Sequence, residues 1–487
     1  MRVLDRGLAW LSHQYLGDIP VDRISTVVAV LLSYALAHVF RRIPPQMSNA
    51  KHVYSIASTL LLFGAVQGQY AGLMHLAVGS VIVYGLIRLM RTRYMPYAVF
   101  LVAMLHMSYS HIRRQLNEQR SGRVELDHTG AQMVFVIKVT SLAFCIYDGQ
   151  QDKAKLSGYQ RKNAIMQAPS LLEFLGYVFF FPGFAVGPAF ELATYRQMIC
   201  LDDAKASGQL ARRGYRKLLE GLFWMAVYVV YSNTYTFAEM ARREFYVQRT
   251  FASTALHLCI TGVVVRAAYY TAWKMSEGAC IVAGLGFDGL DAGRARWLDI
   301  ANVHVRGVET GSSLRQLIDS WNIGTNTWLR HHVYLRIAQR PEGSRASTRA
   351  TVLTFLVSAW WHGFYPGYYL TFVMAALSAN AARILRRNLH APVYAHAGST
   401  VKLVYGLLGW ALSKYTLDFV AAPFMVLTLQ SSLEIWRGNY YAVVVGVVGI
   451  YVLFRGVGRW LGRVGGESAQ PSARKDKVGM GVGLTQK

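Results

Sequence analysis

The sequence predicts an all-α protein that crosses a membrane many times, and three observations lead to this fold class. Of the 487 residues, 53% are hydrophobic and only 16% are charged, which is too apolar for a typical soluble protein. Many windows approach the ~20 apolar residues that a helix needs to cross a bilayer core of ~30 Å. Arginines and lysines gather in the stretches that flank these windows. We therefore predict one polytopic helical membrane domain.

Several of the apolar windows are short for a full crossing. Such windows fit tilted or re-entrant segments, so we predict about 11 spans rather than one for every window. In chain order the windows are Ile24–Phe40, Val53–Val66, Ala71–Ile87, Met95–Tyr109, Met133–Tyr147, Leu171–Phe190, Leu219–Tyr235, Thr254–Val265, Thr351–Trp361, Tyr368–Ile384, Leu403–Thr416, Val420–Leu429 and Tyr440–Phe454.

The first window is expected to be a retained helix and not a signal peptide. Ala35–Ala37 resembles a cleavage site, but the preceding residues balance arginine with aspartate and form no positive region. The domain is expected to cover residues 1–461, followed by a basic, disordered tail at 462–487 that is rich in Gly, Ser and Lys. The most polar internal stretch, His111–Gly130, is predicted to be a loop. The four cysteines are scattered and predict no disulfide framework.

The net charge of +25 is attributed to membrane topology and not to nucleic-acid binding. Basic residues mark the loops at Arg41–Lys51 and Arg88–Arg93 and load the C-terminal tail. Because positive loops face the cytoplasm, we expect these three regions to lie on that side. The same charge attracts anionic lipid head groups, and it is compatible with recruiting a phosphate-bearing substrate from the cytosol.

The segment "WNIGTNTWLRHHVYLRIAQR", residues 321–340, mixes charged and aromatic residues in a way that the spans do not. Leu329, Val333 and Ile337 recur at every fourth position, which places them on one face of a helix. The pattern predicts an amphipathic helix at or just below the membrane interface. An ordinary cytosolic connecting helix is the alternative.

His362 is a titratable residue in the apolar stretch "SAWWHGFYPGYYLTF". Ionisable groups inside a membrane are costly and usually face the protein interior or a wet cavity. Gly363 and Gly367 offer a surface for close approach, and Pro366 predicts that the helix breaks just after the histidine. A broken helix at membrane depth must be buried in protein or line a cavity. There a neutral imidazole can serve as a general base, although it could also simply hydrogen-bond to an adjacent helix.

Asn322 is the second candidate catalytic residue. Its carboxamide can orient a substrate or donate a hydrogen bond to an oxyanion, whereas the alternative role for an Asn near a helix start is a cap. If the segment is helical, Asn322 shares a face with Asn326. The pair His331-His332 invites a metal interpretation, but no HxxxH or HExxH motif occurs, so we expect no metal. We expect the pair to lie at the membrane interface with Arg330. The absence of a GxSxG elbow and a P-loop leaves serine hydrolysis and nucleotide hydrolysis unsupported.

Taken together, "WNIGTNTWLRHHVYLRI" and "TFLVSAWWHGFYPGYYLTF" resemble the signature of the membrane-bound O-acyltransferase family, and within it the lysophospholipid acyltransferase branch. The upstream stretches "PSLLEFLGYVFFFPGFAVGPAFEL" and "YYTAWKMSEGACIVAGLGFDG" also resemble that branch, so the similarity spans most of the chain. The combination is specific, whereas WHG alone is a weak signal. The WN…WL motif of the branch matches Asn322, and its WHGxxPGY motif matches Trp361, His362, Gly363, Pro366, Gly367 and Tyr368.

This resemblance implies a helical fold around a reaction chamber within the membrane. It implies transfer of a fatty acyl group from acyl-CoA to the free hydroxyl of a lysophospholipid, with His362 as general base and Asn322 as its partner. Acyl-CoA is then a co-substrate and no cofactor is needed. The implied location is the endoplasmic reticulum membrane, with several crossings, and the expected partners are membrane lipids and the two substrates, not nucleic acid.

Substrate binding is assigned to a wider set of residues. Arg330, Arg336 and Lys402 are candidates for the CoA phosphates. Glu173, Glu191 and Glu277 either line the chamber or pair with basic residues, and we favour pairing. Tyr334 and Tyr368 either orient a head group or pack at the interface. The predicted substrate-binding set is Trp361, Tyr368, Asn326, Arg330, Tyr334 and Glu277.

Two alternative functions are considered. One is a sterol or protein O-acyltransferase of the same family, against which the upstream stretches argue. The other is a transporter, which would place its polar residues along a substrate path and would show inverted hydropathy repeats. No such repeat is evident in the sequence.

Overall fold

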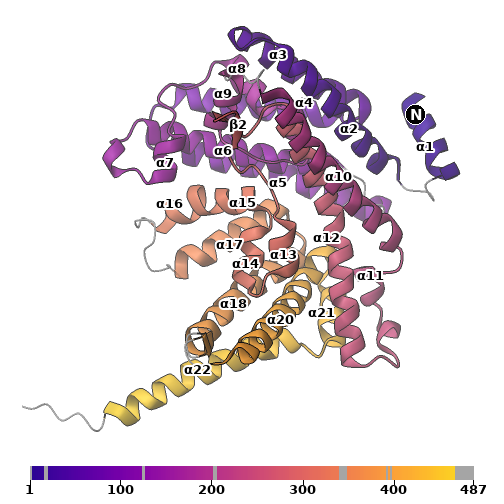
Figure 1. Ribbon diagram of the computed structural model, residues 1–487, viewed down its shortest axis with the longest axis vertical. Coiled ribbons are helices and arrows are strands. Elements are labelled where there is room, and N and C mark those ends of the chain that lie inside the picture. Colours follow the sequence, from indigo (N-terminus) through magenta and orange to yellow (C-terminus); the bar gives the residue numbers. More distant parts are fainter. Residues whose placement is uncertain are drawn as a thin grey trace, which may run out of the picture.

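The structure is a computed structural model, and it describes residues 3–15, 20–122, 127–200, 206–338, 348–390, 393–394 and 397–466. These residues form helices almost throughout, with one antiparallel pair of short strands, so the predicted helical class is confirmed (Figure 1). The helix α22 continues to Gly466, and the rest of the predicted tail lies outside the described residues.

The elements follow in three groups along the chain. The N-terminal group is α1 (Val3–Tyr15), α2 (Val21–Arg42), η1 (Pro45–Met47), α3 (Ser48–Thr59), the π-helix η2 (Leu60–Val66), α4 (Tyr70–Leu89), α5 (Met95–Ser121), α6 (Thr129–Gly149), η3 (Lys153–Lys155) and α7 (Gly158–Asn163). The central group is α8 (Leu171–Val178), η4 (Phe181–Gly183), α9 (Leu192–Cys200), α10 (Ser207–Tyr231), α11 (Phe237–Met240), η6 (Arg243–Tyr246), α12 (Phe251–Val282), β1 (Phe287–Asp291), β2 (Arg294–Trp297), α13 (Val305–Thr310) and α14 (Leu314–Ser320). The C-terminal group is α15 (Ile323–Trp328), the π-helix η7 (Leu329–Tyr334), α16 (Leu335–Ala338), α17 (Thr348–His362), α18 (Pro366–Leu385), the π-helix η8 (Arg386–His390), α20 (Ser399–Val426), α21 (Leu429–Gly438) and α22 (Ala442–Gly466).

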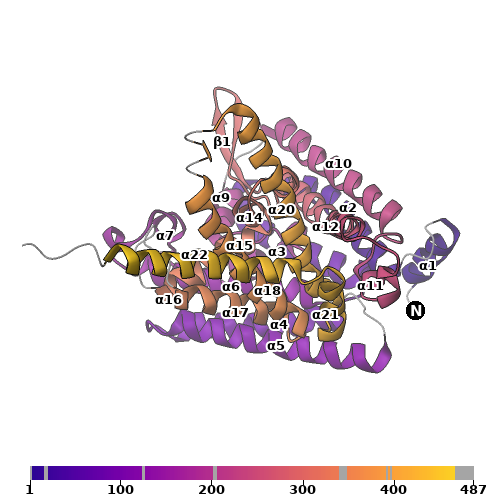
Figure 2. The ribbon, with the colours of Figure 1, turned by 90° about the horizontal axis from the view of Figure 1, so that it is seen from below.

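Two apolar cores hold these groups together. The larger core joins α2 to α6, α8, α9 and the C-terminal end of α12, and it receives Trp328 and Trp361 from the C-terminal group. The second core joins α18, α20, α21 and α22 to the short elements α11 and η6. The helix α17 contacts α5 and α18, and α18 contacts α22, so α17 and α18 connect the two cores (Figure 2).

Five helices among the described residues are long and apolar enough to cross a membrane, or up to six if the bent pair α21 and α22 is one span. They are α2, α4, α6, α12 and the helix Pro366–Leu389. The chain is therefore a multi-pass membrane protein, but the predicted count of about 11 spans is not confirmed. Helices α5, α10 and α20 are longer than 20 residues but less apolar.

Three sequence predictions of local structure are wrong. Leu403–Thr416 and Val420–Leu429 are not separate spans, because α20 runs through both windows up to Val426. Leu171–Phe190 is not one span, because α8 ends at Val178 and the 3-10 turn η4 follows at Pro182. His111–Gly130 is not a loop throughout, since α5 continues to Ser121.

Hydropathy divides α20 into two windows because this helix carries charged residues in its middle, and these residues are buried in the structure. Asp418 lies in the middle of this helix and is fully buried, where it accepts a hydrogen bond from Arg266 on α12. Glu309 accepts from Arg266 and from Lys414 at 2.8 and 2.5 Å. Burial by itself raises the pKa of the Glu309 carboxyl group. The charges and hydrogen bonds of Arg266 and Lys414 have a larger effect in the opposite direction and lower this pKa to about 2. Because each buried charge has a partner of opposite sign, the helix can pass through its polar stretch without a break.

Helices α10 and α12 pack closely at a pair of glycines. A Cβ atom on Gly278 would lie 2.6 Å from the carbonyl oxygen of Gly214, and it would overlap the hydroxyl of Tyr34. A Cβ atom on Gly214 would lie 2.7 Å from the carbonyl oxygen of Gly278. Small residues of this kind let membrane helices approach backbone to backbone.

We expect Gly278→Ala to lower the thermal unfolding midpoint of the purified protein, because the added methyl group has no room. Overpacking of this kind costs about 1–3 kcal/mol. Gly85→Ala on α4 is the matched control, since a Cβ atom there meets nothing within 4 Å. Equal midpoints for the two variants in the same detergent would contradict the close packing of α10 and α12.

Candidate active site

The helix break that the sequence predicts after His362 is present. Helix α17 ends at His362, Gly363 has a φ of 123°, and α18 begins at Pro366. This value of φ lies outside the range that residues with a side chain readily adopt, so the turn requires glycine. The amide of Gly367 donates to the carbonyl oxygen of Leu427 at 2.8 Å, which confirms the predicted close approach at this glycine.

The imidazole of His362 lies among aromatic rings. Its centroid is 4.6 Å from the ring of Trp361, 4.9 Å from Phe424, 5.2 Å from Phe372 and 5.7 Å from Tyr368. Neither imidazole nitrogen has a hydrogen-bond partner in the part of the chain that the structure describes, and the residue is partly exposed. The alternative of a histidine bonded to an adjacent helix is therefore not observed. The ring is held by packing, and its nitrogens can accept a proton from a substrate.

Two tryptophans bring the predicted site segments together. The indole nitrogen of Trp361 donates to the carbonyl oxygen of Met133 at 3.1 Å, and that of Trp328 donates to the hydroxyl of Thr140 at 2.9 Å. The two indole rings lie 5.8 Å apart. Since Met133 and Thr140 both belong to α6, this helix fixes α15 and α17 side by side. Trp361, predicted to bind substrate, is largely buried and serves this contact.

Asn322 adopts a left-handed conformation with φ 46° and ψ 52°, immediately before α15. Its side chain makes no cap bond but accepts from the hydroxyl of Thr325 at 2.9 Å. Within the described residues its amide nitrogen donates to no protein group, so two N–H donors stay available. The prediction that Asn322 and Asn326 share a helical face is wrong, because Asn322 precedes the helix. Non-glycine residues in this conformation are strained and cluster at functional sites.

Asn302 and Asn326 hold this strained loop in place. The amide of Ile323 donates to the carbonyl oxygen of Asn302 at 2.9 Å, and the amide of Gly324 donates to its Oδ1 at 3.3 Å. The Nδ2 of Asn326 donates to the carbonyl oxygens of Ile318 and Trp321 at 2.7 and 2.8 Å. Both amide hydrogens of Asn326 are thus used by the backbone, while its predicted contact with substrate stays a prediction.

The structure does not join Asn322 to His362 directly. No hydrogen bond connects the two side chains among the described residues, although the tryptophan pair places their segments side by side. The partnership of Asn322 and His362 in catalysis stays a prediction.

The remaining predicted residues lie outside this arrangement. Glu277 is 3% exposed and pairs with Lys217 at 3.1 Å and Lys274 at 3.0 Å, as the pairing interpretation predicts. Glu173 pairs with Arg196 at 2.7 Å. Arg330 is exposed, Tyr334 is half-buried, and their roles in binding stay predictions.

His331 and His332 do not both lie at the interface with Arg330, because His332 is buried. Its Nε2 lies 3.2 Å from Glu191, which also accepts from the hydroxyl of Tyr159 at 2.8 Å. Burial raises the pKa of Glu191, but the hydrogen bond and charge of His332 and the other donors lower it below its ordinary value. Ligand atoms of Cys145, Glu191 and His332 lie within 4.8 Å of one another, so these three residues have the spacing of a metal site. That the protein needs no metal stays a prediction.

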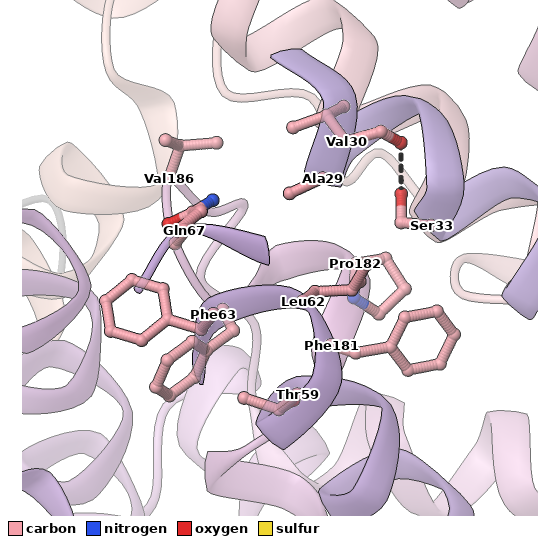
Figure 3. A pocket seen from close by; sticks show the side chains of 12 residues that line it. Ala29, Val30, Ser33, Thr59, Leu62, Phe63, Gln67, Phe181, Pro182 and Val186 are labelled. Carbon is pink, nitrogen blue, oxygen red and sulfur yellow. Dashed lines mark hydrogen bonds between the residues drawn. The ribbon is translucent and has the colours of Figure 1, made fainter. Parts of the chain in front are cut away.

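A small hollow and a larger groove are present in the described part of the chain. Figure 3 shows the first, between α2, η2 and the segment 181–186, with a cavity volume of about 20 Å³. It has room for about one water molecule, and none of its lining residues belongs to the site. The second is an apolar groove of about 450 Å³ that begins at Phe364 and Pro366, next to the break. An enclosed reaction chamber stays a prediction.

The fold and the site together define a multi-pass membrane protein with an unbonded histidine at a broken helix. The model of the membrane-bound O-acyltransferase family matches residues 120–414 of the chain. The chain belongs to this family, as the sequence motifs predict, and it is therefore an acyltransferase.

Curated relatives extend the similarity over most of the chain. A lysophospholipid acyltransferase of Schizosaccharomyces pombe is 32% identical over 471 residues, which cover 90% of this chain and 88% of that protein. The lysophospholipid acyltransferase of Saccharomyces cerevisiae is also 32% identical, over 88% of this chain and 73% of that protein. Membrane-bound glycerophospholipid O-acyltransferase 2 of Rattus norvegicus is 30% identical over 88% of this chain and 83% of that protein.

Proposed function

We propose that the protein is a lysophospholipid acyltransferase that moves a fatty acyl group from acyl-CoA to the free hydroxyl of a lysophospholipid. The observation that carries this proposal is the imidazole of His362, which makes no hydrogen bond within the described parts of the chain and lies at a break between two helices. The names of the relatives support a lysophospholipid as the acceptor. Sterol and protein acceptors, and transport, have no comparable support.

In the proposed reaction, Nδ1 or Nε2 of His362 accepts the proton of the acceptor hydroxyl as its oxygen attacks the thioester carbonyl carbon. The amide of Asn322 donates to the carbonyl oxygen as negative charge develops there. The C–S bond then breaks, and the departing thiolate takes the proton from the imidazolium. The products are the new ester and free CoA, so no proton, metal or cofactor is consumed. Holding both reactants at one place supplies much of the rate, and no covalent acyl-enzyme is required.

The endoplasmic reticulum is the proposed location, and acyl-CoA is the proposed donor. The apolar helices and the family support a membrane location in general. Basic residues at a cytosolic opening, of which Arg330 is exposed, are proposed to attract the CoA phosphates. Arg336 donates to both carboxylate oxygens of Asp148, so its charge is already paired.

The test is a panel of acceptors and donors offered to membranes that contain the protein. Lysophospholipids of several head groups, a sterol and a serine peptide are each incubated with saturated and unsaturated acyl-CoAs, and the products are identified by mass. We expect diacyl phospholipids and no sterol ester or acylated peptide. Membranes with the His362→Ala variant at the same protein level give the background. Formation of sterol ester or acyl-peptide alone would refute the lysophospholipid assignment.

A further inference from the structure

A cluster of charged side chains lies against the helix break that follows His362. The hydroxyl of Tyr365, inside the break, donates to Glu118 near the end of α5. Arg114 donates through Nε to Oε1 of the same carboxylate at 2.7 Å, and its Nη1 lies 3.7 Å from Oδ1 of Asp127. The side chains of Arg114, Glu118 and Asp127 are 31%, 10% and 27% exposed. The three charged groups carry one positive and two negative charges, and they are accessible in part.

Tyr368 connects this cluster to the candidate base. Its ring centroid lies 5.7 Å from that of His362 and 6.1 Å from that of Tyr365. Arg114 and Glu118 both lie within electrostatic range of Tyr368. Two ring contacts thus separate the imidazole from the charged groups. In a lysophospholipid, a phosphodiester and a short linker separate the free hydroxyl from the end of the head group, so one molecule can reach both places.

The apolar groove begins at the two residues that adjoin Tyr365 in the sequence. Phe364 and Pro366 line the groove and flank Tyr365 on either side. Pro366, Tyr369, Leu370 and Val373 share one face of α18 through their i, i+3, i+4 and i+7 spacing, and Leu429 completes the groove. The groove has a volume of about 450 Å³ and is open along its length, with Phe364, Val373 and Leu429 exposed. An apolar groove beside a mixed charge cluster matches a molecule with one tail and one charged head.

We propose that Arg114, Glu118, Asp127 and Tyr365 form a head-group site for a zwitterionic lysophospholipid, with its tail in the adjacent groove. The inference rests on the proposed function and names the acceptor class. Glu118 and Asp127 accept hydrogen bonds from the ammonium group, and Arg114 donates to the phosphate. The rings of Tyr365 and Tyr368 offer their faces to the cation. Because negative charge exceeds positive charge in the site, it favours head groups with an amine over anionic ones that lack it.

The test compares two acceptors in one preparation of the purified full-length protein. Lysophosphatidylethanolamine and lysophosphatidic acid with the same acyl chain are each titrated at saturating acyl-CoA, and the ratio of their kcat/KM values is measured. We expect Glu118→Gln to lower this ratio by about 10-fold, because it removes the charge that meets the ammonium group. Asp127→Asn is expected to lower it by roughly 3-fold, since Asp127 is more exposed. Any loss of folded protein cancels in the ratio.

Glu173→Gln is the matched control. Oε1 of Glu173 accepts from Nε of Arg196 at 2.7 Å, the same geometry as the Arg114–Glu118 pair, and Glu173 is 19% exposed. The ratio of the kcat/KM values for the two acceptors should be the same in Glu173→Gln as in the wild type. An unchanged ratio in both Glu118→Gln and Asp127→Asn, or an equal fall for both acceptors, would overturn the head-group site alone. A wild-type protein that acylates no lysophospholipid would overturn the proposed function as well.

Discussion

His362→Ala is expected to lower kcat for acyl transfer by about 10²–10⁴-fold, the usual contribution of a general base. The reason is geometric: the imidazole is positioned by Trp361, Phe372 and Phe424 and makes no hydrogen bond to the described residues, so its nitrogens serve no structural role there. The measurement is the initial rate with labelled acyl-CoA in membranes that contain equal amounts of each variant. Protein level and membrane insertion are determined in parallel, because loss of either would lower the rate without any effect on chemistry.

His257→Ala is the matched control for this prediction. His257 lies in the membrane helix α12 among aromatic rings, 4.9 Å from Tyr235 and 4.8 Å from Phe245, and among the described residues its Nε2 likewise has no partner. Its removal should leave the rate within about 2-fold of the wild type, because a packing histidine contributes stability and not chemistry. Near-normal turnover by His362→Ala, or an equal loss in both variants, would show that His362 is not the base.

The local features of the site could be predicted because they depend on short-range backbone rules. Pro366, three positions after Gly363, lacks a backbone donor and disfavours helical geometry at the residue before it, so the break between His362 and Pro366 follows from the sequence. The helical class follows in the same way from the apolar composition. The pairing of Glu277 with lysines was also predictable, since a carboxylate in an apolar segment needs a partner.

Long-range partners could not be predicted, and most errors trace to them. Hydropathy divided α20 at its polar stretch because it contains no information on long-range partners. Arg266, more than a hundred residues earlier, neutralises Asp418 in that stretch. His332 was expected at the interface, but Glu191 supports its burial. No motif marks Glu118, because its partner Tyr365 lies far away in the sequence, between α17 and α18. A sequence shows which residues need a partner but not where the fold supplies it.

The conformation of Asn322 was missed for a different reason. The spacing of Leu329, Val333 and Ile337 favoured a helix for the segment 321–340, whereas hydrogen bonds from Ile323 and Gly324 to Asn302 hold the chain in a left-handed turn at Asn322. Asparagine tolerates that turn better than most residues. The only available signal was its position directly before a helix, which the cap interpretation already used. The structure therefore adds the geometry that the motif alone does not contain.

Asn322→Gly is expected to lower kcat by about 10²–10³-fold, the usual cost of losing one oxyanion donor. Glycine adopts the left-handed conformation without strain, so this variant removes the carboxamide and keeps the backbone. Asn322→Ala should lose at least as much activity and also some stability, because alanine pays roughly 1–2 kcal/mol in this conformation. Rates with saturating acyl-CoA and lysophospholipid, together with unfolding midpoints, separate the chemical effect from the structural one.

Gln248→Gly provides the control for the backbone, since Gln248 is another amide residue with a positive φ, 62°, and lies exposed in a loop. Its rate should match the wild type. If Asn322→Gly keeps full activity while Asn322→Ala loses it, the role of Asn322 is to shape the turn and its amide takes no part in the reaction. If both lose activity and only Asn322→Ala loses stability, the two free N–H donors act on the substrate. The second result is expected, because the side-chain oxygen of Asn322 is bonded to Thr325 while its nitrogen is not bonded within the described chain.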